Sequence, residues 1–111
     1  MLNSTQMIDQ TEQWQALSAH WDKLSAMHMR QLFETDPGRC ERYSLDACGV
    51  HLDYSKNLID DRAMQLLLDL AQVAELPEWG RRLIGGEKVN STEGRSVLHM
   101  ALRNLGYRDY Q

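Results

Sequence analysis

A glycine-rich stretch with one lysine is the first place where this sequence could do chemistry. Residues 85–92 read "GGEKVNST" and include Lys88. A phosphate-binding loop requires its lysine directly before a serine or threonine, after a strand and a spaced pair of glycines. Here Val89 follows Lys88. The pattern therefore favours a glycine turn and a helix cap over a phosphate site.

Two cysteines and a histidine form a second candidate group. Cys40, Cys48 and His51 could supply three metal ligands. A structural zinc site uses four ligands, usually with a short spacing between paired cysteines that these two lack. On a straight strand the two cysteines would lie roughly 26 Å apart, too far for a disulfide. We therefore expect small buried thiols and no metal site.

The other histidines fit structural positions better than catalytic ones. His20, His28 and His99 have neither a matching helical spacing nor the neighbouring cysteine that would mark a nucleophile pair. An enzyme built on His99 with Glu87 or Glu93 would still need a nucleophile and a cleft, and neither is evident. We expect His99 to be a half-buried, hydrogen-bonded side chain.

Acidic pairs and a sequon also have structural explanations. Asp60-Asp61 and Glu34–Asp36 lie at predicted helix boundaries, where capping and the helix dipole account for them. Asn90-Ser91-Thr92 matches a glycosylation sequon, which matters only in a secreted protein. We predict no catalytic, cofactor-binding or metal-binding residue in this chain.

The elements that would carry these residues are mostly helical. Trp14, Leu17, Trp21 and Leu24 recur at helical spacing, which predicts an amphipathic helix from about Thr11. The helical signal continues after a break near residue 25, until Asp36-Pro37-Gly38 ends it.

From residue 42 the apolar period changes to two. Tyr43, Leu45 and Ala47, then residues 50, 52 and 54, alternate with polar residues, which predicts a β-hairpin. Its turn at Cys48-Gly49 fits a two-residue turn or a three-residue loop with Gly49 in a left-handed bulge. A lone hairpin is marginal in water, so it must pack on the helices or on something outside this chain.

Three further helices are predicted after the hairpin. Asp60 is the expected N-cap of a helix that runs to about residue 74, with Ile59 and Met64 spaced as a hydrophobic staple. Its apolar residues spread over more than one face, so we expect it to be buried on more than one side. A short helix with Pro77 in its first turn comes next and ends at Gly85-Gly86.

The last predicted helix starts at the cap residue Asn90. Glu93 would complete a capping box, and the apolar stripe of the helix comprises Val97, Leu98, Ala101 and Leu102. The sequence thus predicts a mostly α fold with one small β-hairpin.

Composition excludes several classes of partner. The chain has 111 residues, enough for one domain, and its 42% apolar and 25% charged residues are ordinary for a globular protein. A net charge of −4 without a basic stripe argues against nucleic acid. No signal peptide and no membrane-spanning stretch is evident, so we expect a cytoplasmic protein.

Two long segments resemble a known family. "GEKVNSTEGRSVLHMALRN", residues 86–104, is similar to the pattern G-E-K-[IV]-N-x-T-E-x-R-[AS]-V-L-H-x-A-L-R of the glucose-6-phosphate isomerase (phosphoglucose isomerase) family. "DPGRCERYSLDACGVHLDYSKNLIDDRAMQLLLDLAQVAEL", residues 36–76, matches the upstream part of the same family in the same order. The resemblance covers residues 14–104.

The resemblance implies a scaffold role. Family members are homodimers that interconvert glucose 6-phosphate and fructose 6-phosphate through an enediol, in glycolysis and gluconeogenesis, without metal or organic cofactor. Their base, ring-opening histidine, arginine and phosphate pocket come later, in two sugar-isomerase α/β domains, and have no matching positions here. We expect residues 1–104 to be the N-terminal scaffold segment of such an α/β protein, inactive alone.

Residues 105–111 depart from the family pattern. They read "LGYRDYQ" where the family continues with an arginine and a small polar residue. An altered reading frame, a truncated gene and an engineered end each account for such a divergent tail.

A second hypothesis is a stand-alone interaction module. It would bind a partner, or itself, through apolar surface that further domains would otherwise cover. The candidate residues for that surface are Trp14, Trp21, Trp79, Tyr43 and Tyr54.

Overall fold

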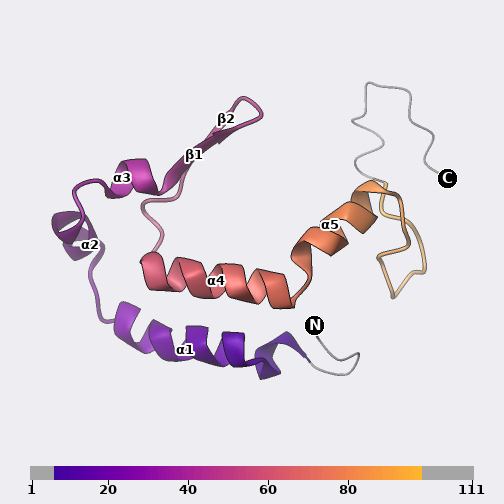
Figure 1. Cartoon of the computed structure of the whole chain (residues 1–111), viewed down its shortest axis with the longest axis horizontal. Coiled ribbons are helices and arrows are strands. Elements are labelled where there is room, and N and C mark those ends of the chain that lie inside the picture. Colours follow the sequence, from indigo (N-terminus) through magenta and orange to yellow (C-terminus); the bar gives the residue numbers. More distant parts are fainter. Residues whose placement is uncertain (1–6, 99–111) are drawn as a thin grey trace.

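The computed structural model describes residues 7–98 as a chain of helices interrupted by one hairpin (Figure 1). Its elements are the short 3-10 helix η1 (Ile8–Gln10), α1 (Glu12–Leu24), α2 (Met29–Thr35), α3 (Arg39–Arg42), β1 (Ser44–Ala47), β2 (Val50–Asp53), α4 (Asp61–Val73) and α5 (Leu76–Ile84). The predicted class, mostly α with one two-stranded antiparallel sheet, is confirmed.

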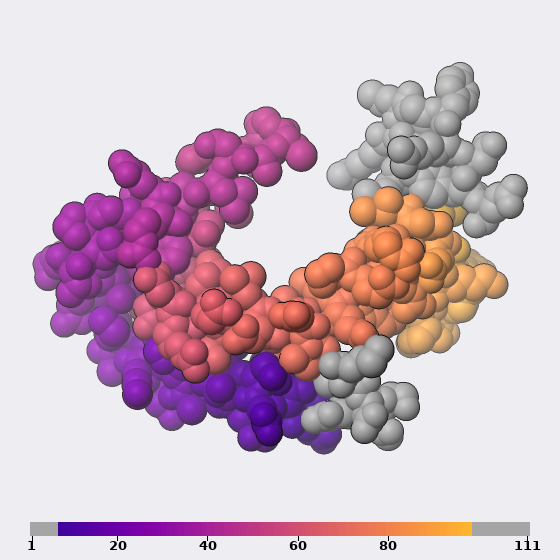
Figure 2. All heavy atoms as spheres, in the orientation of Figure 1, coloured from indigo at the N-terminus to yellow at the C-terminus, as the bar shows by residue number. Residues whose placement is uncertain are grey.

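The molecule is an open arc rather than a ball. α1 and α4 lie side by side along its lower edge, α2 and α3 lead away from them at one end, and α5 rises at the other (Figure 1). The hairpin projects above the hollow of the arc, which the space-filling view shows between β1–β2 and α5 (Figure 2). The extents of the chain are 52 × 39 × 19 Å.

The first helix and its break follow the sequence prediction. Thr11 caps α1 by accepting a hydrogen bond from the Trp14 amide at 3.2 Å. The chain breaks after Leu24 and restarts at α2, where the His28 side chain accepts from Arg30 N and Gln31 completes a capping box. α2 ends at Thr35, before Asp36-Pro37-Gly38, as predicted.

The hairpin has a two-residue turn. Leu45 pairs with Leu52 and Ala47 with Val50, so only Cys48 and Gly49 form the loop. Their φ angles of 52° and 75° are those of a type I′ turn, which decides between the two predicted turns.

The packing predicted for the hairpin is not provided by the described helices. Apart from Ser44, which is half-buried, every residue of the two strands is exposed. Whatever covers this hairpin is therefore not found in residues 7–98.

Helix α4 is buried along one face only. Ala63, Leu66 and Leu70 are buried at helical spacing and face the packed side, and Asp60 caps the helix through the Ala63 amide at 2.7 Å. Leu67 and Leu68 remain 39% and 58% exposed. The prediction of burial on more than one side is wrong because α1 is the one long helix packed on α4 in the described residues.

After α4 the chain turns into α5 and then into a loop. Glu75 adopts a left-handed φ of 54° between the helices, and Pro77 lies in the first turn of α5, as predicted. No helix described here is long and apolar enough to span a membrane.

The helix predicted from Asn90 is wrong over residues 90–98. Asn90 Oδ1 does accept from Thr92 N and Glu93 N, at 3.1 and 3.2 Å, but these bonds close a turn. Gly94 then adopts a φ of 61°, outside the helical region, and Asn90 bridges to Arg95. Residues 101 and 102 of the predicted stripe lie outside the described part.

Candidate functional site

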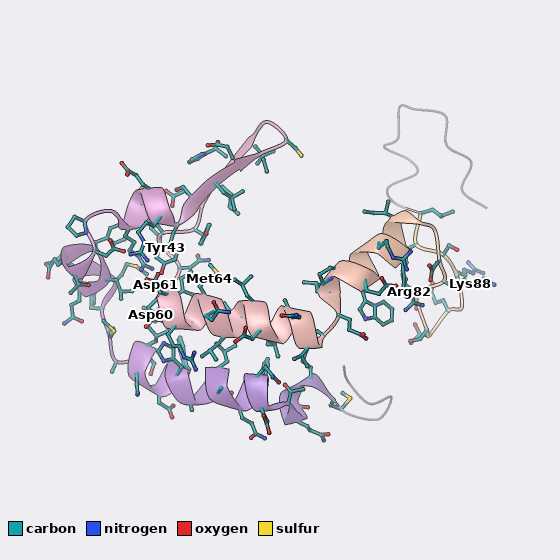
Figure 3. The ribbon with its side chains drawn as sticks, in the orientation of Figure 1. Tyr43, Asp60, Asp61, Met64, Arg82 and Lys88 are labelled. Carbon is teal, nitrogen blue, oxygen red and sulfur yellow. The ribbon has the colours of Figure 1, made fainter. Side chains whose placement is uncertain are left out.

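A group of linked polar side chains lies where α3 meets the start of α4. We call it the Arg39 cluster, and its members are Asp36, Arg39, Arg42, Tyr43 and Asp61. Figure 3 shows Tyr43 and Asp61 together at this junction, with Asp60 at the first turn of α4 beside them.

Arg39 ties the segment after the hairpin to α3. It is 2% exposed, and its Nε donates to the Ser55 carbonyl at 2.8 Å. Its Nη2 donates to the carbonyls of Asn57 and Ile59 at 2.9 and 2.8 Å. The guanidinium also lies 4.6 Å from the centroid of the Tyr43 ring. A buried arginine with these partners holds backbone in place and is shielded from an incoming anion.

Tyr43 links the same site to α4. Its hydroxyl donates to Asp61 Oδ1 at 2.6 Å. Burial of the ring and the hydrogen bond to Asp61 raise the pKa of Tyr43 to about 12, so the hydroxyl is protonated at neutral pH. The same hydroxyl, with Arg42, lowers the pKa of Asp61. A tyrosine held in this way is a poor proton acceptor.

Arg42 is shared between two carboxylates. Its Nη1 lies 2.9 Å from Asp36 Oδ2, and its Nη2 contacts Asp61. A small cavity of about 180 Å³ at this junction is lined by three carboxylates and two arginines among other residues. Because carboxylates outnumber the guanidinium groups in this cavity, it offers a sugar phosphate no net electrostatic attraction.

His20 and Asp60 join α1 to α4. Nε2 of His20 lies 2.8 and 3.0 Å from the two carboxylate oxygens of Asp60. Burial alone would raise the pKa of Asp60, but the Ala63 amide and His20 outweigh it, so the pKa is lowered. With its carboxylate also serving as the helix cap, Asp60 has the capping role that the sequence predicted.

The cysteine group does not assemble. Both cysteines are exposed, which makes the prediction of buried thiols wrong, and both are free thiols. Cys40 Sγ lies 3.8 Å from Asp53 Oδ2, whereas His51 Nδ1 lies 2.8 Å from Asp46 Oδ1. Within residues 7–98 no three such side chains gather in a way that could hold a metal ion.

The lysine stretch lies at the other end of the arc. Figure 3 shows Lys88 in the segment beyond α5, far from Asp60 and Asp61. Arg82, also labelled there, pairs with Glu87 at 2.8 Å and lies 4.6 Å from the Trp79 ring centroid. Glu87 is therefore engaged by an arginine, and His99, its proposed partner, lies outside the described residues.

Sequence reasoning missed Arg39 and the bond between Tyr43 and Asp61. Arginine is rarely fully buried, so nothing in the local pattern marked Arg39 as an interior residue. The useful signal was its position directly after Asp36-Pro37-Gly38. A helix ends there, and side chains just beyond that end have to connect it to the rest of the fold.

The predicted apolar surface is present in part. Trp14, Trp21 and Trp79 are 41%, 52% and 44% exposed, whereas Tyr43 is 4% exposed and does not belong to it. The first two tryptophans help to line a groove of about 500 Å³ between α1 and α4.

Comparisons with known proteins agree with one another. The model of the family described as phosphoglucose isomerase matches residues 53–110. The chain is 49% identical to glucose-6-phosphate isomerase of Deinococcus deserti over 96 residues, which are 86% of this chain and 18% of the relative. It is 53% identical to glucose-6-phosphate isomerase 1 of Neisseria gonorrhoeae over 91 residues, 82% of this chain and 17% of that relative.

A third relative extends the coverage. The glucose-6-phosphate isomerase of Anaeromyxobacter dehalogenans is 48% identical over 103 residues, 93% of this chain and 19% of its own length. The chain therefore spans less than a fifth of the relatives that it matches. Because the family model covers 58 of the 111 residues and these relatives are about half identical, the chain belongs to the phosphoglucose isomerase family.

Proposed function

We propose that this chain is the N-terminal scaffold of a glucose-6-phosphate isomerase and that it does not isomerise sugar phosphates by itself. The observation that carries the proposal is the Arg39 cluster. Its guanidinium and hydroxyl donors are directed at carbonyls and carboxylates of the same chain, with the most polar member buried. Such a cluster positions backbone and offers little to a substrate.

The reaction named in the relatives sets what the rest of such an enzyme must supply. Isomerisation between an aldose and a ketose needs a positioned base and stabilisation of a negatively charged enediolate. The carboxylates of Asp60 and Asp61 are already bound to His20, Arg42 and Tyr43, and their lowered pKa values make them weak bases. The proposed role of this chain is therefore to hold further α/β domains, with residues 105–111 as a tail outside the scaffold segment.

The proposal also includes the setting of the parent protein. We infer a cytoplasmic enzyme of glycolysis and gluconeogenesis, acting as a homodimer. The name of the relatives at about 50% identity, glucose-6-phosphate isomerase, supports the metabolic part of this inference.

Two preparations test the proposed function. The 111-residue chain, purified from a host without its own isomerase, is supplied with fructose 6-phosphate, and glucose 6-phosphate is measured by a coupled dehydrogenase. We expect no conversion above the buffer blank. Turnover by this chain would contradict the scaffold role.

The second preparation is a chimera. The matched segment of this chain replaces the corresponding 96 residues of the Deinococcus deserti relative, and the same assay is run. We expect isomerase activity within about tenfold of the parent, because one or two imperfect contacts cost on the order of 1.4 kcal/mol. A chimera that is folded by circular dichroism but inactive would also contradict the proposal.

A further inference from the structure

The hairpin carries an apolar face that nothing in the described structure covers. Cross-strand partners in an antiparallel pair lie on the same face, and so do residues two apart in one strand. Leu45 and Ala47 of β1 therefore share a face with their partners Leu52 and Val50 of β2. We call these four residues the hairpin's apolar face.

Its exposure is unusual for side chains of this kind. Leu45, Val50 and Leu52 are 46%, 64% and 50% exposed, and Ala47 is exposed as well. The opposite face is polar, with Ser44, Asp46, His51 and Asp53. A strict alternation of apolar and polar residues fixes which face must be buried. The side chains are thus arranged for a contact on one face only.

The hairpin is also fixed at its base, which leaves the apolar face accessible for a contact. Its base is anchored by the buried Tyr43, whose ring meets that of Tyr54 edge-on at 5.5 Å, and by the bond from Tyr54 N to the Tyr43 carbonyl at 2.8 Å. Beyond that base the two strands project above the hollow of the arc (Figures 1 and 2).

The size of the face indicates its occupant. Four residues of strand extend roughly 13 Å, and two strands are about 10 Å wide, so the face measures on the order of 130 Å². A stable complex between separate proteins buries about 800 Å² on each partner. The face alone is too small to hold a second copy, and the net charge of −4 adds repulsion between copies. A contact within one polypeptide has no such requirement, because the chain already keeps both surfaces close together.

We propose that the hairpin's apolar face docks, within one isomerase polypeptide, on an apolar surface of the part that the relatives have and this chain lacks. More than four-fifths of each matched relative has no counterpart in this chain, so such an occupant is available in the relatives. The inference rests on the proposed scaffold function and names the surface through which the scaffold holds the other domains.

Two adjacent positions on β2 provide the test. Leu52→Cys places a thiol on the apolar face and His51→Cys places one on the polar face, each in a background with Cys40→Ser and Cys48→Ser. Alkylation at each position is followed by peptide mass spectrometry, in the free chain and in the chimera with the Deinococcus deserti relative. In the free chain both thiols should react at similar rates, because both positions are exposed.

In the chimera we expect alkylation at position 52 to slow by about tenfold or more while position 51 changes little. Equal protection at both positions, or none at position 52, would overturn the proposal. Protection at position 52 in the free chain that grows with concentration would show a second copy as the occupant and would overturn it too.

A stability measurement covers the case in which a cysteine variant fails to fold. The pair Val50→Gln and Leu52→Gln should lower the melting temperature of the chimera by several degrees more than the matched His51→Gln. All three substitutions should leave the free chain unchanged, and a loss there as large as in the chimera would overturn the docking contact. A folded but inactive chimera with selective protection at position 52 would contradict the proposed function and support this contact. An active chimera without protection at position 52 would support the proposed function and contradict this contact.

Discussion

At the scale of single residues, one buried arginine organises the junction between α3 and α4. The carbonyls of Ser55, Asn57 and Ile59 belong to a segment with no regular secondary structure, and Arg39 satisfies all three. A buried carbonyl without a partner is costly, and the Ser55 carbonyl is buried, so the arginine compensates for the absence of helix or sheet there.

Replacing Arg39 tests this role. Arg39→Ala should destabilise the folded state by about 2–4 kcal/mol, because charged hydrogen bonds are lost and the buried Ser55 carbonyl loses its donor. The change is measured by urea denaturation followed by circular dichroism. The matched control is Arg62→Ala, at an exposed position of α4, which should stay within about 0.5 kcal/mol of wild type. Equal effects of the two variants would show that Arg39 is not a structural clamp.

The lowered pKa of Asp60 predicts a loss of stability in acid. A carboxyl whose pKa is depressed by folding stabilises the protein above its unfolded pKa of about 3.9 and loses that contribution as the pH falls through its lower folded value. Asp60→Asn keeps a capping side chain but removes the charge. Its stability should therefore fall less steeply than that of wild type below about pH 4.

The measurement is a series of denaturation curves between pH 7 and pH 2.5. Asp53, Asp61 and Glu78 also have lowered pKa values and remain in the variant, so a residual acid slope is expected. Identical slopes for variant and wild type would contradict a stabilising role for the charged form of Asp60.

At the scale of elements, α4 and the hairpin each carry apolar side chains that the described residues leave partly or wholly exposed. α4 hides Ala63, Leu66 and Leu70 against α1 and leaves Leu67 and Leu68 exposed. The hairpin leaves its whole apolar face uncovered. Local periodicity thus predicted α1, α2, the hairpin, α4 and α5, but it missed α3 and gave a helix from Asn90 that does not form over residues 90–98. The number of faces that each element buries depended on its neighbours.

The turn of the hairpin offers a prediction at this scale. Cys48 adopts a φ of 52°, a left-handed conformation that costs an ordinary side chain about 1–2 kcal/mol. Cys48→Asn would create an Asn-Gly turn, the pair preferred in type I′ turns, and should raise stability by up to about 1 kcal/mol. Cys48→Val should lower it, because a β-branched residue resists this conformation.

Thermal melting of the two Cys48 variants measures the difference. Cys40→Ser on α3 is the control, since it changes an exposed thiol at a position without positive φ, and should melt as wild type does. A stabilising valine together with a destabilising asparagine would exclude the type I′ turn.

At the scale of the whole molecule, the chain forms an open arc with an uncovered concave side. Within residues 7–98 the buried apolar residues are few and lie along the α1–α4 contact and the α2–α3 junction: Leu24, Leu32, Tyr43, Ala63, Leu66 and Leu70. Exposed tryptophans and the groove between α1 and α4 add to the uncovered apolar surface. Such a surface is typical of a segment that belongs to a larger assembly, and the alkylation and chimera experiments test that reading directly.

Much of the local structure could be read from the sequence. Caps at Thr11 and Asp60, the stop at Pro37 and the alternation from Tyr43 onward each act within a few residues, so their outcome depends little on the rest of the chain. The helix predicted from Asn90 shows where prediction from near neighbours stops working. Its capping bonds formed, but Gly94 adopts a backbone conformation that a helix excludes.

The sequence by itself therefore determined α1, α2, α4 and α5, the hairpin, its amphipathic alternation and the membership of the chain in a family. Only the tertiary structure decided that Arg39 lies buried among three carbonyls, that Tyr43 and His20 reach Asp61 and Asp60, and that the cysteines stay apart and exposed. The reason is physical: capping and periodicity are interactions between near neighbours, whereas burial and ion pairing join residues that only the folded backbone brings together.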